Sequence, residues 1–145
     1  MNVTLDDIFP GNSPPIVHQS EAADCGLACL SMVLSHYGYK TDLSSLRRRF
    51  PVSLKGATLS GLIAIADKLG LSCRPLRVDM DEVSSLKLPS ILHWNMNHFV
   101  VLVKSSSSQL TLHDPARGIV KKHWLKLARN FMRGAAARSN AVLTC

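Results

Sequence analysis

The stretch DCGLACLSMVLSHYG, residues 24–38, determines how the first half of the chain is organised. Its apolar residues recur three and four positions apart, as on the buried face of a helix: Leu27, Leu30, Val33, Leu34 and Tyr37. Gly38 follows as a C-terminal stop. The sequence therefore predicts a core helix with Cys25 at its N-terminal end.

A cysteine in this position is a candidate nucleophile. The first turn of a helix offers unpaired backbone N–H groups and the positive end of the helix dipole, and both lower the pKa of a thiol. Gly26 removes a side chain beside the sulfur, and we expect the space to admit a substrate carbonyl. The alternative is that Cys25 is an ordinary packed residue at the head of an apolar helix.

Outside this stretch, the pattern predicts helices first and strands second. Asp42 is placed to cap a short helix closed by Pro51, and a third helix runs from about Thr58 to Leu69 and stops at Gly70. Strands are predicted over Leu71–Val78, Ser90–Trp94, His98–Lys104, Gln109–His113 and Ile119–Lys122, with a helical turn over 81–86 and a last helix over Trp124–Phe131. This order predicts an α+β domain with a mainly antiparallel sheet.

Length and composition indicate one globular domain. The 145 residues are 46% apolar, which is enough for a single core. No run approaches the roughly 20 apolar residues of a membrane span, and the N-terminus lacks the basic start and apolar run of a signal peptide. We therefore expect a soluble, intracellular chain.

The net charge limits the kinds of binding partner, and the cysteine spacing bears on disulfides and metal binding. A net charge of +7 suits nucleic acid, an anionic membrane face or an acidic peptide. Nucleic acid is disfavoured because the basic run 47–49 lacks interleaved aromatics and is expected on the solvated face of a short helix. The four cysteines fit neither a disulfide-rich module nor a four-ligand metal site, so we expect free thiols in a reducing cytosol and no metal: Cys25, Cys29, Cys73 and Cys145.

Nucleophilic catalysis at Cys25 also requires a base, a group that orients the base, and donors for the oxyanion. His98 opens an apolar strand and Asp114 ends the neighbouring strand of the same hairpin, so their side chains can meet across it. Gln19 lies six positions before Cys25, close enough for its amide to reach the space in front of the sulfur. Taken singly, these residues are equally explained as core or turn formers, and the residues alone leave both interpretations open.

Six motifs in order resemble those of the C39 peptidases, the N-terminal domains of bacterial transporters that process and export bacteriocins. They are VHQSEAADCGLACL (17–30), RRRF (47–50), KGATL (55–59), LHW (92–94), HFVVL (98–102) and HDPARG (113–118). The similarity covers about Pro15 to Phe131 and is greatest to the colicin V type of exporter. It implies a papain-like fold in which Cys25 attacks, His98 acts as base and acid, Asp114 orients His98, and Gln19 forms the oxyanion hole with the backbone N–H of Cys25.

The resemblance also implies a substrate and partners. The substrate is a precursor peptide whose amphipathic leader ends in Gly-Gly, Gly-Ala or Gly-Ser before the cut, and such small residues suit a narrow slot. Trp94 and Phe99 are candidates for the wall of that slot, with core packing as the alternative. The other partners are the transmembrane and ATP-binding domains of a transporter, at the cytoplasmic face of the bacterial inner membrane. No cofactor is implied for the peptidase, since ATP serves only the transporter.

This resemblance divides the chain into an N-terminal arm (1–14), a peptidase domain (15–131) and an atypical C-terminal tail (132–145) that does not match the family. A stand-alone peptidase, a shortened chain and a frame shift after Phe131 are alternative explanations of the tail. If this tail replaces the last strand of the core, one edge of the sheet is left unpaired and the domain is less stable. Two other functions also stay open: a docking module that binds an exported peptide without cutting it, and another acyl transfer such as transglutamination.

Overall fold

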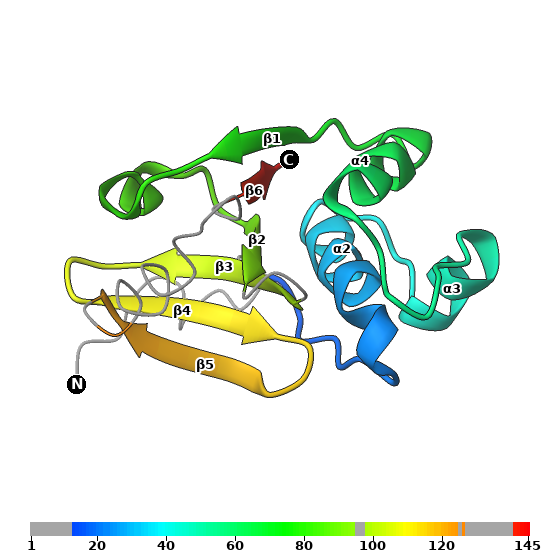
Figure 1. The fold of residues 1–145 in the computed structure, drawn as a ribbon, viewed down its shortest axis with the longest axis horizontal. Coiled ribbons are helices and arrows are strands. Elements are labelled where there is room, and N and C mark those ends of the chain that lie inside the picture. The colour runs from blue at the N-terminus through cyan, green and yellow to red at the C-terminus, as the bar shows by residue number, and fades with distance from the viewer. Residues whose placement is uncertain (1–12, 95–97, 125, 127–140) are drawn as a thin grey trace.

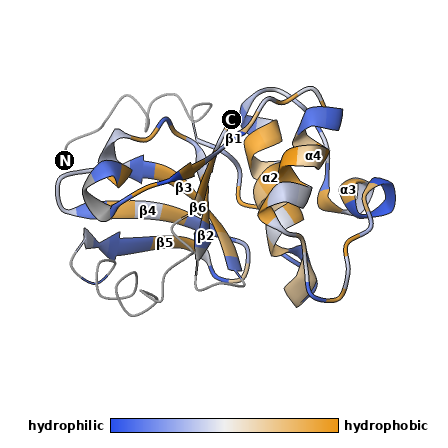
Figure 2. Ribbon diagram, turned by 45° about the horizontal axis from the view of Figure 1, so that its top comes forward, coloured by the Kyte–Doolittle hydropathy of each residue, from blue (hydrophilic) through white to orange (hydrophobic). Residues whose placement is uncertain are grey.

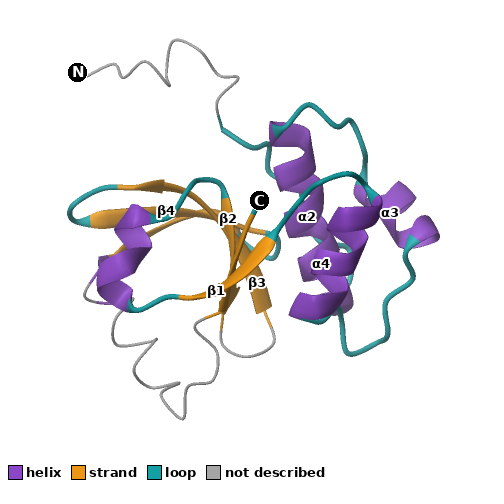
Figure 3. Ribbon diagram, turned by 90° about the horizontal axis from the view of Figure 1, so that it is seen from above, coloured by secondary structure: helices purple, strands orange, loops and turns teal. Residues whose placement is uncertain are grey.

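The computed structural model describes residues 13–94, 98–124, 126 and 141–145, and it places the helices beside an antiparallel sheet (Figure 1). The helical elements are η1 (Ala22–Asp24), α2 (Cys25–His36), α3 (Leu43–Arg49), α4 (Leu59–Lys68) and η2 (Met80–Ser85). The strands are β1 (Arg74–Arg77), β2 (Ser90–Trp94), β3 (His98–Ser105), β4 (Gln109–Asp114), β5 (Gly118–His123) and β6 (Ala141–Thr144). Figure 3 shows the same separation from above, with α2, α3 and α4 gathered on one side. The predicted α+β class is confirmed.

The helix boundaries follow from local capping. The Asp42 carboxylate accepts the Ser45 N–H at 2.7 Å and begins α3, as predicted. The Thr58 hydroxyl accepts the Gly61 N–H at 3.0 Å and begins α4. The predicted helix Trp124–Phe131 lies mostly outside the described residues.

The sheet has the strand order β1-β6-β2-β3-β4-β5, and each neighbouring pair is antiparallel. The hairpin of β3 and β4 brings the start of one strand close to the end of the other, as the sequence predicted for His98 and Asp114. Alternate residues of the central strands enter two separate cores. Ile91, Phe99, Val101 and Leu143 pack with the helices, whereas Leu92, Val100, Leu102 and Val142 pack on the other face. Figure 2 shows apolar residues concentrated where α2 and α4 face the sheet.

The end of the chain corrects one expectation. Residues 141–144 form β6, which lies between β1 and β2 with Val142 and Leu143 buried, so these four residues belong to the sheet. One step beyond the Arg74↔Thr144 pair, Cys73 and Cys145 form a disulfide. The expectation that all four cysteines are free thiols was wrong, because pairing of β1 with β6 brings two distant cysteines opposite each other.

No helix within the described ranges is long and apolar enough to cross a bilayer.

Candidate active site

Cys25 is the first residue of α2, as predicted, and its side chain lies against the hydrophobic core, with only 3% of the residue exposed. The preceding residue, Asp24, is the N-cap, so the sulfur lies in the first helical turn, at the positive end of the helix dipole. Helix α2 therefore holds the thiol where the helices pack against the sheet.

Gly26 serves packing rather than substrate access. A Cβ at this position would lie 3.3 Å from the Ala57 Cβ and from both terminal carbons of Leu62, which is tighter than ordinary contact. The expected opening for a substrate carbonyl was therefore wrong. The missing side chain lets α2 approach α4, a contact that the local sequence does not reveal.

His98, at the start of β3, and Asp114, at the end of β4, meet beside Cys25. The His98 Nε2 and Asp114 Oδ1 atoms are 2.7 Å apart. The same Oδ1 atom accepts the Ala116 N–H at 2.8 Å, and the Asp114 carbonyl accepts the Arg117 N–H at 3.1 Å. The tight turn after β4 thus fixes the Asp114 carboxylate, and the carboxylate holds the His98 imidazole through Nε2. The other ring nitrogen, Nδ1, is then available to interact with Cys25.

The electrostatics of this cluster favour a thiolate beside an imidazolium. Burial raises the pKa of the Cys25 thiol, but the hydrogen bond and charge of His98 and a backbone hydrogen bond from Phe99 outweigh burial, so the pKa lies below that of an ordinary cysteine. The hydrogen bond to Cys25 raises the pKa of His98, burial opposes this, and Asp114 raises it further. By contrast, burial raises the pKa of Cys29, one turn along α2, well above its usual range. Of these two thiols, Cys25 is the one whose pKa is lowered, as a nucleophilic cysteine requires.

Gln19 is tied to the turn that follows Asp114. Its backbone N–H donates to the Pro115 carbonyl at 3.0 Å. Its side-chain oxygen is buried and has no hydrogen-bond partner among the described residues. The Gln19 side-chain amide is therefore not committed to a structural hydrogen bond through this oxygen.

Of the two residues expected to line a substrate slot, the structure describes the side chain of Phe99 but not that of Trp94. Phe99 is 2% exposed and stacks on His93, with ring centroids 4.5 Å apart and an interplanar angle of 14°. It belongs to the core shared with α2, in agreement with the core-packing alternative. The backbone of Trp94 pairs with His98, but its side chain lies outside the described residues.

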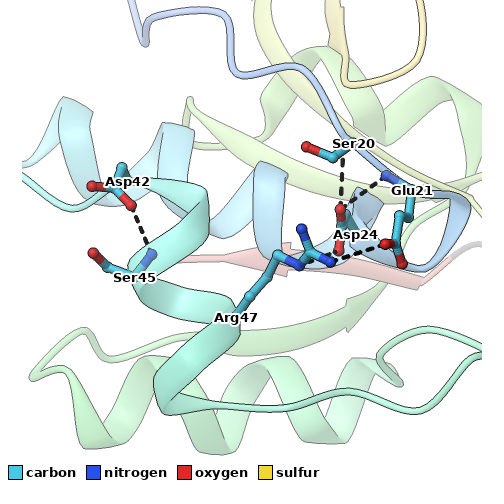
Figure 4. Close-up of polar contacts among 6 residues, drawn as sticks. All are labelled: Ser20, Glu21, Asp24, Asp42, Ser45 and Arg47. Carbon is cyan, nitrogen blue, oxygen red and sulfur yellow. Dashed lines mark hydrogen bonds and ion pairs between the residues drawn. The ribbon is translucent and has the colours of Figure 1, made fainter.

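Sequence reasoning missed a second polar cluster, drawn in Figure 4. Arg47, expected on a solvated face, extends from α3 to two carboxylates, with its Nε 3.3 Å from Asp24 Oδ1 and its NH2 3.1 Å from Glu21 Oε1. The signal in the sequence was an acidic residue, Asp24, directly before the candidate nucleophile, and its burial is visible only in the structure. Its partner could not be identified because Arg47 lies 23 positions away.

No group of three or more His, Cys, Asp or Glu in the described part of the chain is arranged to hold a metal ion. The cluster of Cys25, His98 and Asp114 instead has the components of nucleophilic acyl transfer.

Comparison with known proteins agrees with this geometry. The model of the peptidase C39 family matches residues 13–140. The chain belongs to the peptidase C39 family. It is 52% identical over 117 residues to the colicin V secretion/processing ATP-binding protein CvaB of Escherichia coli, a match covering 81% of this chain and 17% of that protein. It is also 52% identical over 104 residues to the probable microcin-H47 secretion/processing ATP-binding protein MchF of Escherichia coli, covering 72% of this chain and 15% of that protein. The chain thus spans about a sixth of the length of these C39 relatives.

Solved C39 structures confirm the papain-like α+β fold. A double glycine motif protease from an AMS/PCAT transporter, crystallised in complex with the leader peptide, superposes with a TM-score of 0.80 and 31% identity over 91% of this chain and 90% of that one. The peptidase domain of Streptococcus ComA gives a TM-score of 0.75 over 89% of this chain and 95% of that one; at 24% identity it supports the fold alone.

Proposed function

We propose that this C39 domain is a cysteine endopeptidase that removes double-glycine leaders from bacteriocin or microcin precursors. The observation that carries the proposal is the connected set of Cys25, His98 and Asp114, in which the pKa of the thiol is lowered and that of the imidazole is raised. A thiolate–imidazolium pair held by a carboxylate is the reactive state of papain-like peptidases. Family membership and similarity to secretion/processing proteins support the same activity.

The proposed reaction proceeds through an acyl-enzyme. The Cys25 thiolate attacks the carbonyl carbon of the last leader residue, and the oxyanion that forms accepts hydrogen bonds from the Gln19 amide and the Cys25 backbone N–H. His98 gives its proton to the leaving amine as the peptide bond breaks, which leaves a thioester. Water then attacks the thioester, His98 takes a proton from it, and the leader departs with a new carboxylate while the thiolate is restored.

The substrate proposal follows from the relatives. A precursor with an amphipathic leader ending in Gly-Gly, Gly-Ala or Gly-Ser fits the leader complex known for the AMS/PCAT protease. The named exporters suggest that the domain works with transmembrane and ATP-binding domains, at the cytoplasmic face of the inner membrane. The acyl-transfer steps use no organic or metal cofactor, and ATP would serve only the transporter. Trp94 stays a proposed wall of the small-residue slot, whereas Phe99 is better explained by its place in the core.

The experiment is cleavage of a synthetic precursor with a Gly-Gly leader by the reduced protein, read by mass spectrometry. We expect one cut, directly after the glycine pair. Cys25→Ala should lower the rate by at least about 10⁴-fold, since the nucleophile is removed. Cys29→Ala is the matched control, because Cys29 lies on the same helix, is fully buried and has a raised pKa. This control should retain activity.

Other outcomes would point elsewhere. Retained cleavage by Cys25→Ala would refute the assignment of the nucleophile. Binding of the intact precursor by the unmodified protein, without a cut, would favour the docking module. A product joined to an added amine, with no shortened leader, would favour transglutamination.

A further inference from the structure

Asp24 is an N-cap residue that does not cap its helix. An aspartate at the N-cap usually accepts a hydrogen bond from a backbone N–H two or three residues later. Here the carboxylate makes no such bond to α2, although the residue is 98% buried, with 2% exposed. The Asp24 side chain therefore does not fix the first turn of α2 by capping.

The Asp24 carboxylate is instead directed backwards along the chain. Its Oδ2 accepts the Ser20 N–H at 3.3 Å and the Glu21 N–H at 3.0 Å. These bonds close the short segment between Gln19 and Cys25 into a tight turn, which continues into η1. One side chain thus connects the residue after Gln19 to the residue before Cys25 (Figure 4).

Arg47 fixes the other oxygen of the same carboxylate. Its Nε lies 3.3 Å from Asp24 Oδ1, while its NH2 reaches the exposed Glu21. Because the Asp24 charge is buried, it needs this partner, and the guanidinium supplies it from a separate helix. Breaking such a pair on one side leaves a buried charge uncompensated, so each partner constrains the other.

The segment is also anchored at its far end. The Gln19 N–H donates to the Pro115 carbonyl at 3.0 Å, one residue beyond Asp114. Gln19 is therefore held between the turn that orients His98 and the turn that Asp24 closes. The position of the Gln19 side-chain amide therefore depends on both anchors.

From these contacts we infer that Asp24, held by Arg47, is a positioning residue that fixes the Gln19 amide relative to Cys25 during peptide cleavage. The inference rests on the proposed peptidase function and adds two residues that take no part in the acyl-transfer steps themselves. Donors to an oxyanion act only when they are held in place before charge develops. A displacement of about 1 Å in such a site costs as much as about 10²-fold in rate.

A double-mutant cycle tests this inference. Gln19→Ala should lower kcat by about 10²–10³-fold, as loss of an oxyanion donor does. Asp24→Asn should lower kcat by about tenfold when Gln19 is present, which is within the limit for a misplaced group. When Gln19 is already alanine, the same substitution should lower kcat by less than about twofold. The two losses are not additive because Asp24 acts through Gln19. KM should change little in either background.

A second readout separates positioning from general damage. Alkylation of Cys25 by iodoacetamide requires the thiolate but no oxyanion donor, so its rate and pH dependence should be the same in Asp24→Asn as in the unmodified protein. Glu21→Gln is the matched control: it removes the other carboxylate of Arg47, yet Glu21 is exposed, and kcat should stay within about twofold. If Asp24→Asn fails to fold, Arg47→Gln keeps the backbone hydrogen bonds of Asp24 and should show the same non-additivity with Gln19→Ala.

Full additivity of the losses in kcat, or a loss of thiol reactivity equal to the loss of kcat, would overturn the inference while leaving the peptidase proposal intact. Absence of cleavage by the unmodified protein would instead refute the proposed function, and this inference with it.

Discussion

The two ends of α2 lie in regions that are held together by different kinds of contact. At the N-terminal end, Cys25 meets His98 through polar contacts, and burial and charge shift the pKa values of both groups. At the C-terminal end, the Tyr37 hydroxyl donates to the Cys145 carbonyl at 2.8 Å, beside the Cys73–Cys145 disulfide that joins β1 to β6. One end presents the candidate catalytic cluster, and the other lies beside the pair of strands β1 and β6.

This difference indicates that rate and stability are separable in this domain. Changes near the thiol should alter catalysis while the core keeps its packing. Changes at β1 and β6 should lower the free energy of unfolding while the cluster of Cys25, His98 and Asp114 keeps its geometry. Substitutions in each region test whether the separation holds.

Apart from removal of the nucleophile itself, the largest effect is expected from Asp114→Asn. Asp114 holds the His98 Nε2 and raises the pKa of His98. We therefore expect kcat to fall by about 10²–10⁴-fold, as when the orienting carboxylate of a triad is lost. The reactive ion pair exists between the two titrations of the coupled thiol and imidazole. Losing Asp114 lowers the pKa of His98, so the alkaline limb of the pH–kcat/KM profile should move to lower pH.

Asp42→Asn controls for the chemical change, because Asp42 caps α3 on the exposed surface and asparagine caps equally well. Its pH profile should match that of the unmodified protein. An unshifted alkaline limb in Asp114→Asn would show that Asp114 does not tune His98.

The next effect concerns stability at the other end of the molecule. Leu143 is fully buried in β6 and packs with the helices. Leu143→Ala should lower the free energy of unfolding by about 2–5 kcal/mol, through lost burial and the cavity left behind. Urea denaturation measures this loss, and kcat should be unchanged at temperatures where the variant is folded.

The control is Ile119→Ala on edge strand β5, where the residue is 63% exposed, and stability should change by no more than about 0.5 kcal/mol. Equal losses from the two substitutions would show that β6 does not complete the core.

A comparable but smaller loss should follow removal of the disulfide. Cys73 and Cys145 are 72 positions apart, so their link restricts a long loop in the unfolded chain. Replacing both with serine should lower the free energy of unfolding by about 2–4 kcal/mol. Adding a reductant to the unmodified protein should give the same loss, and the double variant should not respond to it. If kcat of the double variant falls under conditions where the protein is fully folded, the regions at the two ends of α2 are coupled.

The sequence predicted what depends on neighbouring residues and missed what depends on distant ones. Local pattern predicted the helix that begins at Cys25, the cap at Asp42, the helix start near Thr58, and the strand ends that carry His98 and Asp114. Whether those residues catalyse peptide cleavage stays a prediction.

The missed features are tertiary. Strand β6 is short and is recognisable only through its partners β1 and β2. The disulfide depends on that pairing, the packing of Gly26 depends on α4, and the ion pair of Arg47 depends on how α3 lies against η1. No local pattern specifies such contacts, because each joins segments whose approach is decided by the whole core.

The smallest effect is expected where the two regions are joined, at Tyr37. Tyr37→Phe removes the hydroxyl that donates to Cys145 but keeps the ring, so the free energy of unfolding should fall by about 0.5–1.5 kcal/mol, nearer the lower value because the bond is exposed. The measurement is urea denaturation beside kcat for a Gly-Gly precursor. Tyr39→Phe is the matched control, since Tyr39 is also exposed, and it should leave stability closer to that of the unmodified protein. If Tyr37→Phe also lowered kcat, a change at one end of α2 would be transmitted along the helix to Cys25, and the chemistry would depend on how the chain end is held.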